Sequence, residues 1–315
     1  MADSLTLSAF AKINWILKIL GRRQDGYHEI LTLLQTIDLH DLLLTEVSGG
    51  TGISLRVRGA DLPEDADNLI WRAADSFRRR TGCDGHFHFE LEKRIPVGAG
   101  LGGGSSDAAV VLLALNAMLG HPLRPAELTA LAAGLGSDIP FFLVGGTVLA
   151  TGRGELLTPW DDAASCRLLL FSPDFQIQAG EAYSQGNWSS LETALELTKT
   201  EANNRIQRFQ GRISRSLPVW DLVENDFERS LFRSYPELSR VQSLLIQAGC
   251  EAVVVCGSGS TTLGIPPAGQ FEKVRARLKN AGLGRVLSSQ TLSRQDYLSR
   301  FETQGLRWTG ARITE

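Results

Sequence analysis

The chain has 315 residues, of which 43% are hydrophobic and 21% charged, and its formal net charge is −3. This composition is typical of a soluble globular protein with one large domain or two ordinary ones. With 32 basic against 35 acidic residues, the chain lacks the basic excess of a general nucleic-acid binder. Its apolar runs, such as residues 108–119, are shorter than the roughly 18 residues that a membrane span requires.

The N-terminus and the cysteines predict a cytoplasmic protein. The first residues, MADSLTLSAFAKIN, do not show the basic and then apolar pattern of a signal peptide. The four cysteines are scattered along the chain and show no CxxC spacing. We therefore expect reduced thiols, and neither nucleic acid nor membrane as a partner.

The first predicted element is a strand over residues 8–20. Alternation of its side chains puts Lys12 and Asn14 on one face, about 7 Å apart. Residues 52–57 and 86–93 also alternate as half-buried strands. Between them, residues 67–82 predict a helix that begins at Asp67 or Asn68 and ends at Gly82.

The remainder of the chain mixes helices and strands. Residues 105–120 predict a buried helix, because they are apolar on all sides and are followed by Gly120 and Pro122. Other predicted helices cover residues 124–136, 236–249 and 268–282, and buried strands cover 166–171 and 251–256. Since strands and helices do not alternate strictly, an α+β fold is favoured.

The polar stretch TPWDDAAS, at residues 158–165, is the predicted boundary between two domains. The expected domains are therefore an N-terminal one over residues 1–160 and a C-terminal one over 161–285. Residues 286–315 show no strong periodicity and are expected to form an extension of unknown role.

A glycine-rich segment, PVGAGLGGGSSDAA, occupies residues 96–109 directly before the buried helix. Glycines allow successive main-chain N–H groups to point into one concavity, and a helix start adds free donors and partial positive charge. The segment thus predicts a phosphate site, with Ser105 or Ser106 as the helix cap. It is not a Walker-type loop, because no lysine precedes Ser105, and it lies outside a βαβ unit of the dinucleotide-binding kind.

This segment resembles the central motif of the GHMP kinases, the family of galactokinase, homoserine kinase, mevalonate kinase and phosphomevalonate kinase. Four further stretches resemble motifs of one branch of that family: residues 11–41, 136–155, 224–228 and 256–264. The resemblance runs from about residue 8 to about residue 283. It implies a two-lobed fold with the active site in the cleft, ATP with Mg²⁺, and transfer of a phosphoryl group to a cytidine diphosphate-linked sugar alcohol of the non-mevalonate isoprenoid pathway. A kinase for another small alcohol and a non-catalytic nucleotide-binding relative are the alternatives.

The resemblance assigns two catalytic residues. Asp138, in GSDIP, matches the catalytic base, which would accept the proton of the attacking hydroxyl. Its alternative role is that of a helix cap. Lys12 matches the active-site lysine and would supply the positive charge that the glycine loop lacks.

The remaining site residues also follow from the resemblance. The residues implied at the substrate are Asn14, which orients the acceptor, Tyr27, His28 and Tyr183 at its cytidine end, and Gly257 and Ser258 in a third loop. The residues implied at ATP are Asn68, Pro96, Gly98, Gly100, Gly102, Gly103, Gly104, Ser105 and Ser106. No carboxylate pair plainly holds a metal; Ser106 is a candidate ligand and Asp107 a weaker one. The sequence departs from the family at Ala179, where relatives commonly carry a hydroxyl residue.

Two patterns are expected to be structural. His86 and His88 have the spacing of metal ligands, but no third ligand is evident. Cys256 lies beside the third glycine loop with no histidine near it in sequence, which favours a buried hydrophobic role over a nucleophilic one.

Overall fold

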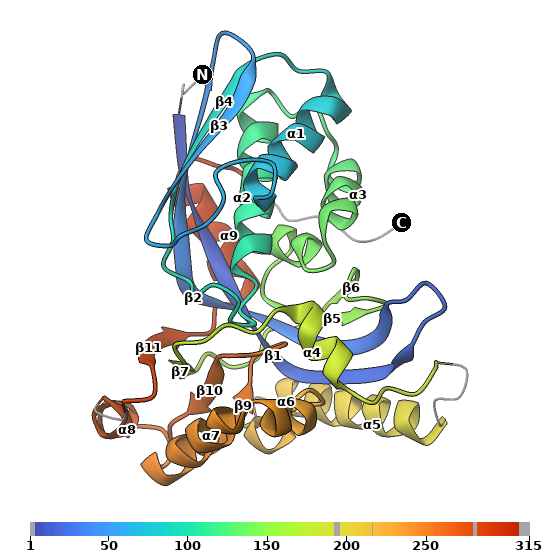
Figure 1. The fold of residues 1–315 in the computed structure, drawn as a ribbon, viewed down its shortest axis with the longest axis vertical. Helices are drawn as coiled ribbons and strands as arrows, with labels where there is room; N and C mark the ends of the chain where they lie inside the picture. Colours follow the sequence, from blue (N-terminus) through green and yellow to red (C-terminus); the bar gives the residue numbers. More distant parts are fainter. Residues whose placement is uncertain (1–3, 192–195, 216, 280–281, 309–315) are drawn as a thin grey trace.

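The computed structural model describes residues 4–191, 196–215, 217–279 and 282–308, which build two sheets with helices packed on them (Figure 1). The first sheet contains β1 (Ser4–Arg22), β2 (His28–Ser48), β3 (Gly52–Arg58), β4 (His86–Glu92), β5 (Thr147–Thr151), β6 (Leu156–Pro159) and β8 (Glu224–Asn225). Its order is β3-β4-β2-β1-β8, with β5 paired to β2 and β6 to β5. The second sheet is antiparallel, in the order β11-β7-β10-β9, and contains β7 (Arg167–Ser172), β9 (Ala252–Val255), β10 (Thr262–Ile265) and β11 (Arg285–Gln290).

The helices divide between the two sheets. The first sheet is accompanied by α1 (Leu69–Thr81), α2 (Gly103–Met118), α3 (Pro125–Leu135), the 3₁₀ helix η1 (Ile139–Leu143) and α9 (Arg294–Thr303). The remaining helices are α4 (Ala179–Gln185), α5 (Glu196–Ile213), η2 (Trp220–Leu222), α6 (Glu228–Ser234), α7 (Pro236–Ala248) and α8 (Phe271–Leu278). Figure 1 shows α1, α2 and α3 together on one face of the first sheet and α7 against the second sheet, so the molecule has two lobes. The two-lobed α+β fold predicted from the sequence is confirmed.

The strand predicted over residues 8–20 lies within β1, which pairs with β2 along nearly its whole length. Both of its faces are buried: Phe10 packs in the core that contains α2, and Trp15 packs in the core shared with the second sheet. Lys12 and Asn14 do lie on one side of the strand, and the Lys12 ammonium donates a 2.9 Å hydrogen bond to Asn14 Oδ1. The predicted placement of Lys12 and Asn14 on one side is therefore correct, but shifts of the β1–β2 register beside both residues interrupt the strict alternation, and neither face is left to solvent.

The sequence predicts the start of α1 correctly but not that of α2, the two helices beside the predicted nucleotide site. Asn68 is the N-cap of α1 and accepts a 2.9 Å hydrogen bond from the Ile70 N–H, and Gly82 ends that helix with φ of 67°. The prediction that Ser105 or Ser106 caps α2 is wrong. Gly102, at φ of 70°, turns the chain directly into the helix, so both serines lie inside the first turns.

The segment that follows β10 and α8 returns to the first lobe. After β11 joins the second sheet, α9 and the residues beyond it bury Tyr297, Phe301, Leu306 and Trp308 in the same core as α2. The four cysteines are free. Among the described residues, there is no helix with the length and apolar character that a membrane crossing would need.

Candidate active site

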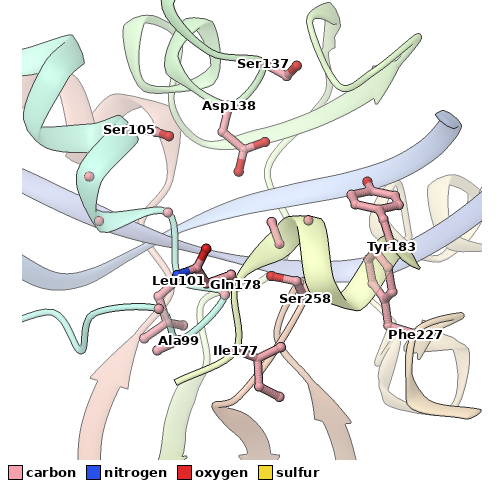
Figure 2. Close-up of a pocket in the computed structure, with 18 of the residues that line it drawn as sticks. Ala99, Leu101, Ser105, Ser137, Asp138, Ile177, Gln178, Tyr183, Phe227 and Ser258 are labelled. Atoms are coloured by element: carbon pink, nitrogen blue, oxygen red, sulfur yellow. The ribbon is translucent and has the colours of Figure 1, made fainter. Parts of the chain in front are cut away.

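A cavity of about 1270 Å³ lies where β1, β2, the glycine loop and the loop after β9 come together. Pockets for a single drug-sized ligand have volumes of roughly 300–1,000 Å³, so this cavity has room for two substrates. Figure 2 shows its layout: Ser105 lies at the start of α2, Tyr183 and Phe227 lie at the opposite end, and Asp138 points its carboxylate into the space between them.

Lys12 enters the cavity from β1 between two glycine loops. Its main-chain N–H donates a 2.9 Å hydrogen bond to the Leu101 carbonyl, which attaches the glycine loop to the strand. A Cβ atom on Gly102 would lie 2.9 Å from Lys12 Cγ, and one on Gly257 would lie 3.1 Å from Lys12 Nζ. The lysine therefore needs both glycines beside it, and it brings a positive charge to a loop that has none of its own.

Asp138 lies opposite Lys12, with 3.6 Å between its Oδ2 and the ammonium. Its side chain is 39% exposed, whereas that of Lys12 is only 6% exposed. Although Asp138 directly precedes η1, its side chain makes no capping hydrogen bond. The carboxylate is thus available to a ligand in the cavity rather than engaged as a cap.

Asn14 holds the Lys12 ammonium in place. While its Oδ1 accepts from Lys12, its Nδ2 donates to Thr32 Oγ1 at 2.8 Å, and that hydroxyl donates to the Ile16 carbonyl at 2.8 Å. All of these groups are buried. Because each of these groups has a hydrogen-bond partner, the position of the ammonium is well determined.

The glycine loop presents main-chain groups to the cavity. Gly98, Gly100 and Gly102 all have positive φ, which residues with a side chain rarely adopt. The N-terminus of α2 receives no hydrogen bond from a capping side chain, so its free N–H groups and the helix dipole face the cavity. Such an arrangement suits phosphate.

All of the site residues predicted from the sequence except Ser106 line this cavity. Ser106 is fully buried, and its Oγ has no hydrogen-bond partner among the described residues. Within the same described ranges, no group of three or more His, Cys, Asp and Glu side chains could hold a metal ion. The placement therefore offers no support for a metal ligand at Ser106.

The far end of the cavity is aromatic. His28 stacks on Tyr183 with ring centroids 4.7 Å apart and planes inclined by 15°, and the Tyr183 ring meets the edge of Phe227. Burial lowers the pKa of His28, so this imidazole is neutral near pH 7. Burial also raises the pKa of the Tyr183 hydroxyl, and the charge of Asp138 adds to that shift. Tyr27 is 54% exposed at the same end.

Several cavity residues were not predicted from the sequence. Buried beside the glycine loop, the Lys93 ammonium donates to Asp41 Oδ2 at 2.5 Å and to Asp107 Oδ2 at 2.7 Å. The signals available were a lysine three positions before the glycine-rich segment and an aspartate inside it. Other unpredicted lining residues are Arg22, Thr32, Ser137, Arg153, Gln178 and Trp188.

The two patterns expected to be structural have local explanations. His88 Nδ1 lies 2.8 Å from the Ser54 hydroxyl on the neighbouring strand β3. Cys256 is buried, and this burial raises its pKa to about 12, which leaves the thiol protonated and unreactive.

Comparison with known proteins agrees with this geometry. Residues 68–146 match the GHMP kinases N terminal domain, and residues 198–283 match the GHMP kinases C terminal domain. The 4-diphosphocytidyl-2-C-methyl-D-erythritol kinase of Pelotomaculum thermopropionicum is 39% identical over 83% of this chain and 88% of its own length. The kinase of the same name from Moorella thermoacetica is 37% identical, over 88% of this chain and 95% of its own.

Solved structures give the same result. A crystal structure of 4-(cytidine 5'-diphospho)-2C-methyl-D-erythritol kinase has a TM-score of 0.72 and 33% identity, and the match covers 91% of this chain and 99% of that one. Homoserine kinase from Cytophaga hutchinsonii has a TM-score of 0.71 at 18% identity, which shows a common fold alone. The chain therefore belongs to the GHMP kinases, in the family of the 4-diphosphocytidyl-2-C-methyl-D-erythritol kinases.

Proposed function

We propose that this protein transfers the γ-phosphoryl group of ATP to the 2-hydroxyl of 4-diphosphocytidyl-2-C-methyl-D-erythritol. The observation that carries the proposal is the approach of the Lys12 ammonium to the Asp138 carboxylate, at 3.6 Å, between a phosphate-binding loop and an aromatic end of one cavity. Curated relatives with this activity in their names match over most of the chain.

Asp138 and Lys12 divide the chemistry between them. The acceptor oxygen forms a bond to the γ-phosphorus, the bond from that phosphorus to the bridging oxygen breaks, and ADP leaves. Asp138 accepts the proton that the hydroxyl loses and passes it to solvent, to which its side chain is 39% exposed. Lys12, fixed by Asn14, stabilises the negative charge on the phosphoryl oxygens during transfer.

The two ends of the cavity bind the two substrates. The free N–H groups at the start of α2 bind the ATP phosphates, and Asn68, which lines the same cavity, is the contact expected on the adenine side. Mg²⁺ bound to the ATP phosphates would neutralise part of their charge. Tyr27, His28 and Tyr183 bind the cytosine ring, since stacking and an imidazole hydrogen bond suit a pyrimidine.

The test is an assay that measures ADP formation from Mg-ATP with three acceptors: the cytidylated one, homoserine and mevalonate. We expect turnover with the cytidylated acceptor alone. ADP formation only with one of the other two would replace the proposed acceptor, and thermal stabilisation by ATP without any turnover would indicate a nucleotide-binding relative.

Replacement of the base tests the roles. Asp138→Asn keeps the size of the side chain but cannot take the proton, so kcat should fall by about 10² to 10⁴ while ATP still binds. Asp84→Asn, in the exposed loop before β4, is the matched control and should leave kcat unchanged. If Asp138→Asn behaved like the control, Asp138 would not be the base.

A further inference from the structure

Arg153, in the turn between β5 and β6, lines the aromatic end of the cavity but has no part in the chemistry described above. Its guanidinium carbon lies 4.7 Å from the centroid of the Tyr27 ring. Contacts within about 6 Å of a ring centroid are attractive, because the cation meets the negative face of the ring. One face of Tyr27 is therefore occupied by a cation.

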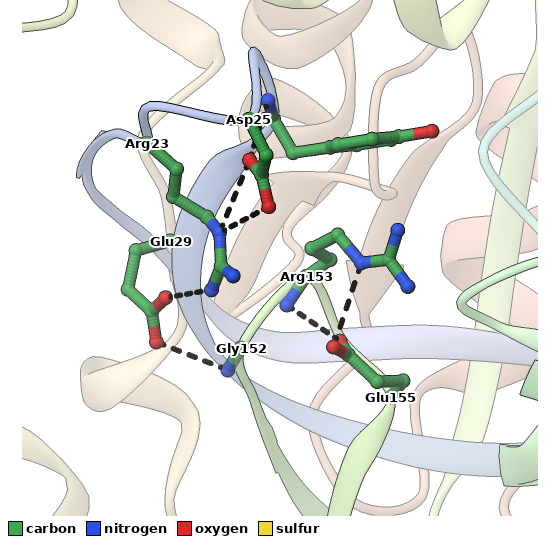
Figure 3. A network of polar contacts seen from close by, with 7 residues as sticks. Arg23, Asp25, Glu29, Gly152, Arg153 and Glu155 are labelled. Atoms are coloured by element: carbon green, nitrogen blue, oxygen red, sulfur yellow. Dashed lines mark hydrogen bonds and ion pairs between the residues drawn. The ribbon is translucent and has the colours of Figure 1, made fainter.

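The turn that carries Arg153 holds this side chain in a defined position. Glu155 accepts the Arg153 main-chain N–H at 2.6 Å and its Nε at 3.4 Å (Figure 3). Gly152 donates its N–H to Glu29 on β2 at 3.2 Å, and its carbonyl accepts from the Ile30 N–H at 2.8 Å. In Figure 3 the terminal nitrogens of Arg153 point away from Glu155, so this carboxylate aligns the guanidinium without covering it.

The hairpin that carries Tyr27 is fixed at its backbone. Asp25 accepts the Tyr27 N–H at 3.1 Å, and the Arg23 N–H donates to the Tyr27 carbonyl at 2.8 Å. Arg23 also donates to Glu29 at 2.6 Å, so Glu29 links this hairpin to the turn of Arg153 (Figure 3). The Tyr27 ring itself, however, is 54% exposed and has little packing to orient it.

We propose that Arg153 is a positioning residue for the acceptor: its guanidinium fixes the Tyr27 ring, so that the opposite ring face stacks on the cytosine. The proposal rests on the proposed function, because it takes a cytidylated acceptor as the substrate. It assigns to the β5–β6 turn a role in acceptor specificity, and it gives a function to the link that Glu29 makes between the two loops.

The first test is the effect of Arg153→Met, which keeps the length of the stem and removes the charge. A cation–π contact at a partly exposed site corresponds to a roughly two- to fivefold change in an equilibrium constant. The KM for the cytidylated acceptor should rise by this factor, with kcat and the KM for ATP unchanged, and Arg153→Lys should restore part of the loss. Arg167→Met is the matched control, because Arg167 also lies over a ring, that of Phe271, away from the cavity. It should leave every kinetic constant unchanged.

The second test is a double-mutant cycle with Tyr27→Ala. If Arg153 acts through the ring, Arg153→Met should have no further effect in the Tyr27→Ala background. An equal effect in both backgrounds would show that Arg153 contacts the acceptor independently and would overturn the proposal. So would an unchanged acceptor KM in Arg153→Met itself.

Binding of cytidine diphosphate separates this proposal from the proposed function. It is measured by calorimetry on the four proteins of the cycle, which are the unmodified protein, Arg153→Met, Tyr27→Ala and the double variant. A cycle that is non-additive for cytidine diphosphate, in a protein that does not phosphorylate the cytidylated acceptor, would retain the role of Arg153 and refute the reaction. Turnover of that acceptor, together with effects on cytidine diphosphate binding that are additive in the cycle, would support the reaction and refute the role of Arg153. Failure of the unmodified protein to bind cytidine diphosphate would overturn the role of Arg153.

Discussion

Two buried lysines beside the glycine loop serve different purposes. Lys12 has one amide and one partly exposed carboxylate near its ammonium, so its charge is directed into the cavity. Lys93 is enclosed by Asp41 and Asp107, and two carboxylates there share one ammonium. Asp41 is further satisfied by the main-chain N–H groups of residues 94 and 95, whereas Asp107 Oδ1 has no partner among the described residues. Asp107 is therefore the less well stabilised carboxylate of the two.

This imbalance predicts a pH-dependent stability. Burial raises the pKa of Asp107 to about 7 from an ordinary value of 3.8, so the folded protein holds this proton more tightly than the unfolded chain does. The free energy of unfolding contributed by Asp107 must then fall as the pH rises from about 4 to about 7. Asp107→Asn removes this loss, so its stability relative to the unmodified protein should increase over that interval and level off above it. Urea unfolding at a series of pH values measures the difference.

Asp41, the other carboxylate bound to Lys93, should show a different dependence of stability on pH. Asp41→Asn should destabilise the protein throughout the pH range, because Asp41 accepts two main-chain hydrogen bonds as well as that of Lys93. Parallel pH curves for Asp107→Asn and the unmodified protein would contradict the conclusion that Asp107 is the less well stabilised carboxylate.

The glycine loop is the element on which the cavity depends, and its glycines are not equivalent. Gly100 has φ of 75°, and a Cβ atom there would lie 1.9 Å from the Cys256 carbonyl oxygen. Gly104 lies in α2, where a Cβ atom would meet Leu69 Cδ1 at an ordinary 3.6 Å. The first is required by the close approach of two backbones, and the second is compatible with a side chain.

Alanine substitutions should separate these two cases. Gly100→Ala forces an unfavourable φ and a clash with backbone, so it should lower the free energy of unfolding by more than about 2 kcal/mol and abolish ATP binding. Gly104→Ala should leave stability unchanged or raise it by up to about 1 kcal/mol, because alanine favours a helix interior. Urea unfolding measures the stability of the two variants, and titration with ATP measures the loss of binding in Gly100→Ala. Equal stability of the two variants would show that the contact with Cys256 can relax.

Local patterns predict ten of the elements in the structure, β2, α5 and α9 not among them, and the contacts between elements require the structure. Asn68 and Gly82 mark the ends of α1 in sequence because capping depends on neighbouring residues. The sequence predicts that α2 begins at residue 105, whereas the helix begins at Gly103, because the conformation of Gly102 ends the loop and a run of glycines does not reveal which of them does so. The partners of Lys93 come from β2 and α2, so no spacing along the chain indicates them.

At the scale of the whole molecule, the two lobes are joined by the returning C-terminal segment. Leu292 accepts a 2.7 Å hydrogen bond from the Gln35 side chain and donates its N–H to the Thr36 carbonyl at 3.0 Å. Beyond it, Tyr297 and Phe301 enter the core of the first lobe. No strong periodicity marks this segment, because α9 buries only these two residues, and the Phe142 carbonyl that Tyr297 contacts lies more than 150 positions earlier.

This returning segment also holds the chain that follows Asp138. The buried Tyr297 hydroxyl donates to the Phe142 carbonyl at 2.5 Å, and Trp308 Nε1 donates to the Leu143 carbonyl at 2.8 Å. Both carbonyls belong to η1, which begins directly after Asp138. The last part of the described chain therefore fixes the segment on which the proposed base depends.

Removal of one hydroxyl tests this connection. Tyr297→Phe leaves the Phe142 carbonyl buried without its donor, which should cost about 1–3 kcal/mol in the free energy of unfolding. Tyr235→Phe, whose hydroxyl donates to Glu181 at an exposed site, should change stability by no more than about 0.5 kcal/mol. Loss of the Tyr297 hydrogen bond should allow η1 to shift, and Asp138, which directly precedes η1, should shift with it. We therefore expect kcat to fall in Tyr297→Phe while the KM for ATP stays constant. Thermal unfolding and steady-state kinetics on the two variants measure these effects, and a Tyr297→Phe protein as stable as Tyr235→Phe would show that η1 does not need the C-terminal segment.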